Sequence, residues 1–137
     1  MTGKTVDELS VGDWAENART ISESDVYGFG GIIGDLNPLH TDEVTASKSV
    51  FGKRVAHGML TASLLSGVLA HQLPGNGTIF MELNVKFLAP VFFGDTVNAR
   101  VEITEIVKRR VTLACACTNQ DGDAVLEGEA KVLAPKK

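Results

Sequence analysis

One helix candidate constrains the fold more than any other part of the chain. Residues 58–73 carry apolar side chains on nearly every side of a helix, and Pro74-Gly75-Asn76-Gly77 ends the segment. A helix that is apolar all round is a buried helix. At 1.5 Å per residue this segment spans about 24 Å, close to the ~28 Å diameter of a domain of 137 residues. The sequence therefore predicts a long helix that crosses the whole domain.

The second half of the chain is typical of β-strands with one buried face. From residue 78 to residue 133, apolar and polar residues alternate with a period of two in four blocks. The first block places five apolar side chains on one face: Ile79, Met81, Leu83, Val85 and Phe87. A weaker strand candidate covers residues 14–21. We therefore expect one domain, residues 1–137, in which an antiparallel sheet of about five strands wraps the helix: the α+β hot dog fold.

The predicted helix needs more cover than one sheet can give. A single sheet packs against one side of a helix, and its edge strands leave backbone groups unpaired. A second copy of the chain would supply the missing cover. We therefore expect a homodimer, or a higher assembly built from it.

Composition excludes several classes of partner. The 13 basic and 17 acidic residues give a formal net charge of −4, whereas a protein that binds duplex nucleic acid presents a basic face to the phosphates. No apolar run reaches the ~18 residues of a membrane span, and residues 1–10 lack the basic-then-apolar order of a secretory signal. We therefore expect no nucleic-acid partner, no membrane partner and a cytoplasmic location.

The two cysteines agree with that location. Cys115 and Cys117 lie two residues apart in an alternating run, so both point to one face of a strand. We expect them to be small core residues, and a disulfide or a metal pair is the alternative.

The densest polar cluster is Gly34-Asp35-Leu36-Asn37-Pro38-Leu39-His40. Pro38 ends the preceding helix candidate, because the residue before a proline is pushed out of the helical region. A rigid turn of this kind can bring the Asp35 carboxylate and the His40 imidazole to one water molecule. Imidazole exchanges protons near neutral pH, and a carboxylate becomes a useful base where an apolar cleft buries it. The alternative is that Asp35 caps backbone amides and that His40 is a surface residue.

A second polar cluster lies at the start of the long helix. Free N–H groups and the helix dipole favour a polarised oxygen there, and Gly58 permits its close approach. The alternative for His57 is a local hydrogen bond at the helix start. Ser63 and Ser66 follow on the same helix, where a hydroxyl usually bonds the carbonyl one turn back, or could instead steady Asp35.

These clusters lie within a longer pattern that resembles a known family. The run Phe29-Gly30-Gly31-Ile32-Ile33-Gly34-Asp35-Leu36-Asn37-Pro38-Leu39-His40, followed by Ala46, is similar to the hydratase-2 motif of the MaoC-like (R)-specific enoyl-CoA hydratases. The likeness continues through Phe51-Gly52, His57-Gly58-Met59-Leu60, Phe87-Leu88-Ala89-Pro90-Val91 and Gly94-Asp95. Ile33 departs from the motif, which prefers a small residue there.

The resemblance implies reversible syn addition of water to a trans-2-enoyl-CoA, giving an (R)-3-hydroxyacyl-CoA, at a dimer interface. Asp35 would take a proton from the attacking water, and His40 would hold that water and help to relay the proton to the α carbon. Gly58 N–H would polarise the thioester carbonyl. Residues that would orient the dyad are Asn37, Ser66 and His57. The coenzyme A thioester would be the substrate, with no cofactor and no metal.

Several expectations stay open at this stage. Val68 and Leu69 are expected beside a substrate tunnel, and Lys53, Arg54 or Arg109 could contact the phosphates of coenzyme A. One rival function is a hot dog acyl-CoA thioesterase, which would release free thiol. The other is a non-catalytic acyl-thioester-binding subunit, which would bind without turnover.

Overall fold

The computed structural model describes residues 3–137 as one long helix packed against one antiparallel sheet. Residues 1 and 2, part of the predicted domain and of the segment without a secretory pattern, lie outside the described part. The strands are β1 (Trp14–Thr20), β2 (Ile79–Phe87), β3 (Thr96–Val107), β4 (Arg110–Thr118) and β5 (Ala124–Leu133). They are ordered β1-β3-β4-β5-β2, and every neighbouring pair is antiparallel. The predicted hot dog architecture is confirmed.

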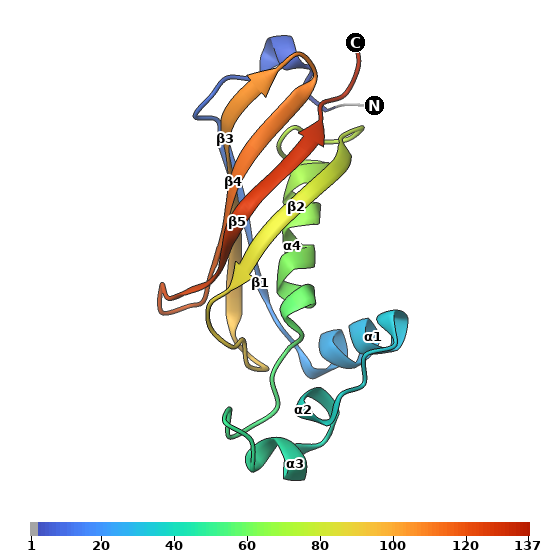
Figure 1. The fold of residues 1–137 in the computed structure, drawn as a ribbon, viewed down its shortest axis with the longest axis vertical. Coiled ribbons are helices and arrows are strands. Elements are labelled where there is room, and N and C mark those ends of the chain that lie inside the picture. The colour runs from blue at the N-terminus through green and yellow to red at the C-terminus, as the bar shows by residue number, and fades with distance from the viewer. Residues whose placement is uncertain (1–2) are drawn as a thin grey trace.

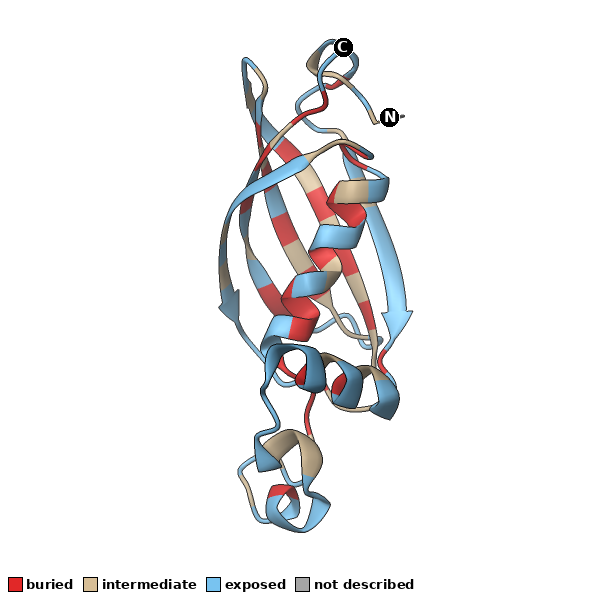
Figure 2. Ribbon diagram, turned by 90° about the vertical axis from the view of Figure 1, so that its right-hand side faces the viewer, coloured by how far each residue is buried: buried red, intermediate tan, exposed pale blue. Residues whose placement is uncertain are grey.

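Helix α4 (Gly58–His71) lies along the concave face of this sheet (Figure 1). It begins at the predicted residue and ends two residues early, because Leu73 precedes Pro74 and cannot be helical there. Its buried face carries Leu60, Thr61, Ala62, Leu65, Val68 and Leu69. The opposite face is exposed at Met59, Ser63 and Ser66, as Figure 2 shows for the outer side of the helix. The expectation of burial on every side is therefore wrong for the single chain, since five strands cover only one side.

The edge strand β2 also departs from the sequence pattern. Phe80 pairs with Val132 and Leu83 pairs with Ala130, with a β-bulge between Phe80 and Glu82. Because a bulge adds one residue to one strand, it shifts the alternation by one position. Phe80, rather than Met81, therefore shares the inner face with Leu83.

Both cysteines lie on the inner face of β4. Cys115 and Cys117 are buried free thiols, as expected for small core residues. Burial raises the pKa of Cys115 to about 11 and that of Cys117 to about 12. Both sulfurs therefore stay protonated at neutral pH. No helix within residues 3–137 is both long enough and apolar enough to cross a membrane.

Three short helices lie beyond the end of the sheet, of which α1 is next to the first turn of α4 and α3 is furthest from it (Figure 1). They are α1 (Glu23–Ile33), α2 (Pro38–Thr41) and α3 (Glu43–Ser47), and a 3-10 turn (Val6–Glu8) lies near the opposite end of the sheet. We call residues 22–56 the helical extension. It begins with a capping box, in which Asp25 N–H donates to Ser22 Oγ and Ser22 N–H donates to the Asp25 carboxylate, each at 3.0 Å.

A glycine on β5 allows β2 to approach closely. A Cβ added at Gly128 would lie 2.0 Å from the Asn84 carbonyl oxygen, which is backbone and cannot turn aside. We expect Gly128→Ala to lower the free energy of unfolding in urea by about 3 kcal/mol, the upper range for overpacking. Gly28→Ala is the control, because no atom of the described residues lies within 4 Å of the added methyl in α1. Helix propensity predicts a gain of up to about 1 kcal/mol for that variant. Equal stabilities for the two variants would contradict the close packing of β2 on β5.

Candidate active site

Local turn chemistry positions Asp35 and His40. Gly34 ends α1 in the left-handed conformation with φ of 76°, and Asp35 N–H donates to the Gly30 carbonyl at 3.0 Å. Asn37 then caps α2, in which Pro38 is the first residue and His40 the third. The chain therefore reverses within a few residues and presents both side chains on one side.

The two side chains face each other across a gap that one water molecule can bridge. Asp35 Oδ2 lies 4.0 Å from His40 Nε2. This distance is too long for a direct hydrogen bond, but a water about 2.8 Å from each atom fits between them. The side chain of His40 is 12% exposed, so the alternative of a surface histidine is wrong, whereas Asp35 is 48% exposed. The apolar cleft expected around the carboxylate is therefore not supplied by this chain alone.

A backbone carbonyl fixes the orientation of the His40 ring. His40 Nδ1 lies 2.6 Å from the Val55 carbonyl oxygen. A carbonyl only accepts hydrogen bonds, so Nδ1 carries the proton and donates. In the neutral ring, Nε2 is therefore free to accept a proton, and it is the nitrogen that faces Asp35.

His57 contacts both residues of the dyad. Its Nε2–H donates to the backbone carbonyl of Asp35 at 2.8 Å, and Nε2 lies 4.0 Å from Asp35 Oδ2. The ring stacks on His40 with centroids 3.9 Å apart, while Phe29 meets it edge-on at 5.4 Å. His57 Nδ1 is buried and has no hydrogen-bond partner among residues 3–137. The structure therefore brings His57 to the dyad, against Asp35 through the backbone and against His40 by ring stacking.

The other two residues expected to orient the dyad lie in different places. Asn37 contacts Asp35 through its backbone, whose N–H donates to Asp35 Oδ1 at 3.2 Å, while its own Oδ1 accepts from Leu39 N–H at 3.0 Å. Ser66 lies on the exposed face of α4, two turns after Gly58. Ser63 donates to the Met59 carbonyl at 2.6 Å, the one-turn-back bond expected of a helical serine.

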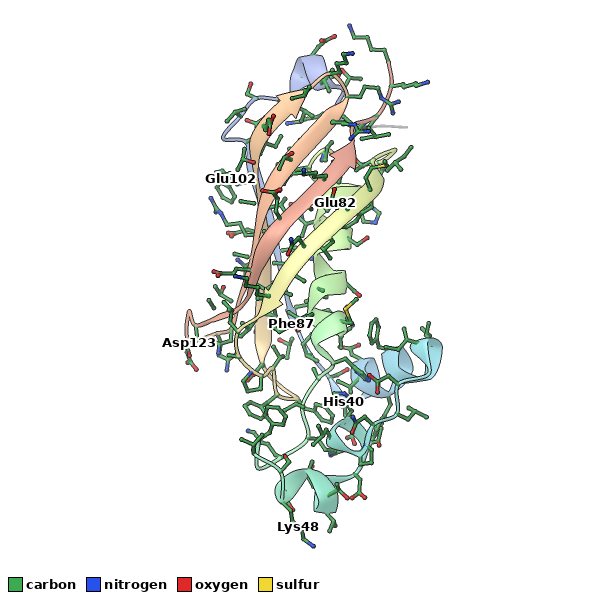
Figure 3. The ribbon with its side chains drawn as sticks, in the orientation of Figure 1. His40, Lys48, Glu82, Phe87, Glu102 and Asp123 are labelled. Carbon is green, nitrogen blue, oxygen red and sulfur yellow. The ribbon has the colours of Figure 1, made fainter. Side chains whose placement is uncertain are left out.

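A cavity of about 530 Å³ opens beside the dyad and the start of α4. Gly58 and His40 line it together with a mostly apolar wall: Leu39, Phe51, Val55, Ala56, Met59, Thr61, Phe87, Leu88, Ala89, Pro90, Val91 and Val125. The first amides of α4 have no side-chain cap, so Gly58 N–H is available to an oxygen in the cavity. A Cβ at Gly58 would lie 2.8 Å from the Phe87 ring, which explains why the position suits glycine. Figure 3 shows Phe87 and His40 near the same end of the sheet.

The residues expected beside a tunnel lie deeper. Val68 and Leu69 are buried in the core on the sheet-facing side of α4, more than two turns beyond Gly58. In the described part of the chain they are outside the cavity wall. Their part in substrate binding stays a prediction.

The three candidate phosphate contacts have other partners. Arg54 binds Glu23 and Glu43, and Arg109 donates to the Ala134 carbonyl. Lys53 lies over the Phe92 ring at 4.4 Å. Of the three residues, Lys53 is the one whose charge is not paired with a carboxylate or a carbonyl in the described part of the chain.

Asp35, His40 and His57 are also a set that could hold a metal ion, because their ligand atoms lie within 4.8 Å of one another. Nε2 of His57 is already committed to the Asp35 carbonyl, however, and its remaining nitrogen is buried. A metal would have to displace that bond to reach three protein ligands. The donor set therefore fits proton transfer to a bound water better than a resident metal.

Sequence reasoning missed two elements of the site. One is the Val55 carbonyl, which no sequence signal could single out because every residue has one. The other is Arg54, which the sequence suggested only as a phosphate contact. Its real neighbours come from distant positions in the chain.

The chain shares fold and sequence with characterised proteins. The family model for the MaoC like domain matches residues 13–122. The chain is 46% identical to an (R)-specific enoyl-CoA hydratase of Rhodospirillum rubrum, over 96% of this chain and 92% of that one. It is 45% identical to a 3-hydroxybutyryl-CoA dehydratase of Methylorubrum extorquens, over 96% of this chain and 84% of that one. The structure of unliganded R-hydratase PhaJ1 from Pseudomonas aeruginosa superposes with a TM-score of 0.94 at 39% identity, over 98% of this chain and 88% of that one.

The cap on α2 gives a direct test of how His40 is held. Asn37→Ala removes the acceptor of the Leu39 N–H and should destabilise the cap by about 1 kcal/mol. We expect the Leu39 amide to exchange its hydrogen about fivefold faster in an NMR exchange experiment. Asp42→Ala is the matched control, because Asp42 caps α3 through Val44 and Thr45. An unchanged Leu39 rate, with faster exchange at Val44 in the control, would show that Asn37 does not hold α2.

Proposed function

The chain belongs to the MaoC like family, and from that premise we propose that it is an (R)-specific enoyl-CoA hydratase, a hydro-lyase that also dehydrates (R)-3-hydroxyacyl-CoA. One observation carries the proposal. The Asp35 carboxylate and the free Nε2 of His40 face each other at 4.0 Å, beside an apolar cavity that also receives the start of α4. This arrangement offers a base, a proton relay and an oxyanion donor to one substrate.

The first step is activation of water. A water molecule between Asp35 Oδ2 and His40 Nε2 gives a proton to the carboxylate, and its oxygen attacks C3 of the enoyl thioester. His40 keeps its orientation throughout, because Nδ1–H stays on the Val55 carbonyl. The ring therefore holds the water on the side from which it attacks.

The second step is protonation at C2. As the C3–O bond forms, the π electrons move toward C2 and the thioester carbonyl, and Gly58 N–H stabilises the oxygen that gains charge. The proton held by the dyad then passes to C2. Because the hydroxyl and the proton both come from one side of the double bond, the addition is syn.

The proposed reaction requires no cofactor or metal. Addition of water causes no net oxidation or reduction, and Asp35 and His40 supply the proton transfers between them. We therefore propose that the coenzyme A thioester is the substrate and that there is no cofactor or metal. In the proposed complex the acyl part occupies the apolar cavity, and Val68 and Leu69 set how far that cavity can extend.

We also propose that the working form is a homodimer, or an assembly of such dimers. Support comes from the exposed outer face of α4, the exposed edge strand β2 and the half-exposed Asp35, which a second copy would cover. The buried, reduced cysteines agree with a cytoplasmic location, which we include in the proposal.

The activity assay uses the absorbance of the conjugated enoyl thioester. Crotonyl-CoA should lose that absorbance with the protein, and chiral analysis should identify (R)-3-hydroxybutyryl-CoA. Asp35→Asn removes the base, so we expect kcat to fall about 10³-fold. Asp42→Asn is the matched control, since asparagine also caps helices, and the Asp42 side chain caps α3 while its backbone N–H keeps the bond to the Pro38 carbonyl at the end of α2. Its activity should stay within about twofold of that of the wild-type protein.

Three results would contradict this proposal. Release of thiol from saturated acyl-CoA, detected with a thiol-reactive dye, would indicate a thioesterase. Binding of crotonyl-CoA without turnover would indicate a binding subunit. A wild-type rate in Asp35→Asn would exclude the carboxylate as the base.

The role of Gly58 has its own test. In Gly58→Ala the methyl meets the Phe87 ring and crowds the carbonyl site, so we expect kcat/KM for crotonyl-CoA to fall about 10- to 100-fold. Phe87→Leu and the double variant separate the two causes. If carbonyl access matters, the double variant stays at least about tenfold below Phe87→Leu. Full recovery in the double variant would show that the loss comes only from the displaced ring.

A further inference from the structure

Arg54 joins helices that are distant in sequence. Its Nη1 donates to Glu23 Oε1 at 2.6 Å and to the Tyr27 hydroxyl at 2.8 Å, both on α1, and its Nε donates to Glu43 Oε2 on α3 at 2.6 Å. The guanidinium also lies over the Phe93 ring, 4.8 Å from its centroid. One side chain therefore ties α1 and α3 to the segment before α4.

The same residue is linked to the segment that holds His40 through its neighbours Val55 and Tyr27. Its neighbour Val55 accepts from His40 Nδ1 through its carbonyl at 2.6 Å, and Val55 N–H donates to the Leu39 carbonyl at 3.1 Å. Tyr27, which Arg54 contacts, donates its hydroxyl hydrogen to the Thr41 carbonyl at the end of α2 at 3.0 Å. The middle and the last residue of α2 are thus linked to Arg54 through one intermediate residue, Val55 or Tyr27.

The chemistry of arginine suits this position. The Arg54 side chain is 20% exposed, while each of its two carboxylate partners is 55% exposed. The hydrogen bonds that Arg54 donates to Glu23 and Glu43 raise the pKa of Arg54 further above its ordinary value, so it is always charged. Its planar guanidinium can donate hydrogen bonds to two carboxylates and a hydroxyl at once in fixed directions. A lysine ammonium has three donors on a flexible stem and fixes these directions less well.

We propose that Arg54 is a positioning residue that sets the Asp35–His40 geometry by clamping α1 and α3 onto the segment that carries the Val55 carbonyl. This inference rests on the proposed hydratase function for its kinetic effect. Arg54 lies outside the wall of the cavity within the described chain, so it acts on the dyad and not on the substrate. A small displacement of reacting groups costs up to about 100-fold in rate.

The kinetic test compares Arg54→Ala and Arg54→Lys with Arg100→Ala. Arg100 is the matched control, because it also pairs with two carboxylates, Glu16 and Glu102, and lies over an aromatic ring, Trp14, but on β3, outside the helical extension. We expect Arg54→Ala to lower kcat for crotonyl-CoA at least tenfold, with KM changed less than threefold. Arg54→Lys should recover only part of that loss, and Arg100→Ala should keep wild-type kcat and KM.

The link through Tyr27 can be tested separately. Tyr27→Phe keeps the ring but removes the hydroxyl that joins Arg54 to the Thr41 carbonyl. We expect a threefold to tenfold loss of kcat in this variant. When Tyr27→Phe is combined with Arg54→Ala, the loss should not exceed that of Arg54→Ala alone, since both act through one network.

Amide hydrogen exchange gives a readout that does not depend on activity. Arg54→Ala should accelerate exchange in α2 and α3 at least tenfold and leave the amides of β3 and β4 unchanged. If this exchange pattern is found but the wild-type protein does not hydrate crotonyl-CoA, the role of Arg54 as a clamp is supported and the proposed hydratase function is wrong. A wild-type kcat in Arg54→Ala would overturn the proposal, because Arg54 would then have no effect on the dyad. Equal acceleration of amide exchange in the sheet and in the helical extension would also overturn it, because Arg54 would then stabilise the whole fold and not the extension.

Discussion

The sheet can cover only one side of α4, and the arrangement of the molecule depends on this constraint. Leu65, Val68 and Leu69 pack against the strands, while the opposite face of α4 stays exposed. The sheet ends near the first turn of α4, so the amides at Gly58 open into a cavity instead of into packed side chains. Between β1 and α4 the chain leaves the sheet, and the helical extension folds into short helices that depend on caps, turns and ion pairs. The site lies at the boundary between these two kinds of structure.

Backbone carbonyls, more than side chains, set the geometry of the dyad. Val55 accepts from His40, and Asp35 accepts from His57 through its main chain. A carbonyl does not titrate between acidic and basic pH, so it holds the ring in the same orientation whether the far nitrogen is protonated or not. His40 can therefore exchange a proton at Nε2 without turning. The cost is that the catalytic geometry depends on where the main chain lies, which explains why a clamp such as Arg54 would matter.

Local patterns in the sequence predicted most of the fold and the centre of the site. Alternation identified the strands, and Pro38 placed Asp35 and His40 in one turn, because both signals act within a few residues. Features that depend on long-range contacts were not predictable. The bulge at Phe80 arises from pairing with β5, and the contacts of Arg54 come from positions 11 and 31 residues away. The one-sided burial of α4 depends on how many strands one chain supplies.

In the proposed complex, binding and chemistry depend on different groups around the cavity. Its wall is almost entirely apolar, and Thr61 is the one side-chain hydroxyl among its described lining residues. Burial of an acyl chain there stabilises the complex by roughly 0.8 kcal/mol per methylene, and it does so equally before and during the reaction. Acceleration must come from groups whose interactions strengthen as charge develops. In the proposed reaction these are Gly58 N–H, His40 and Asp35, so the first turn of α4 and the extension that holds His40 and Asp35 control the rate, while the apolar wall of the cavity controls which substrate stays bound.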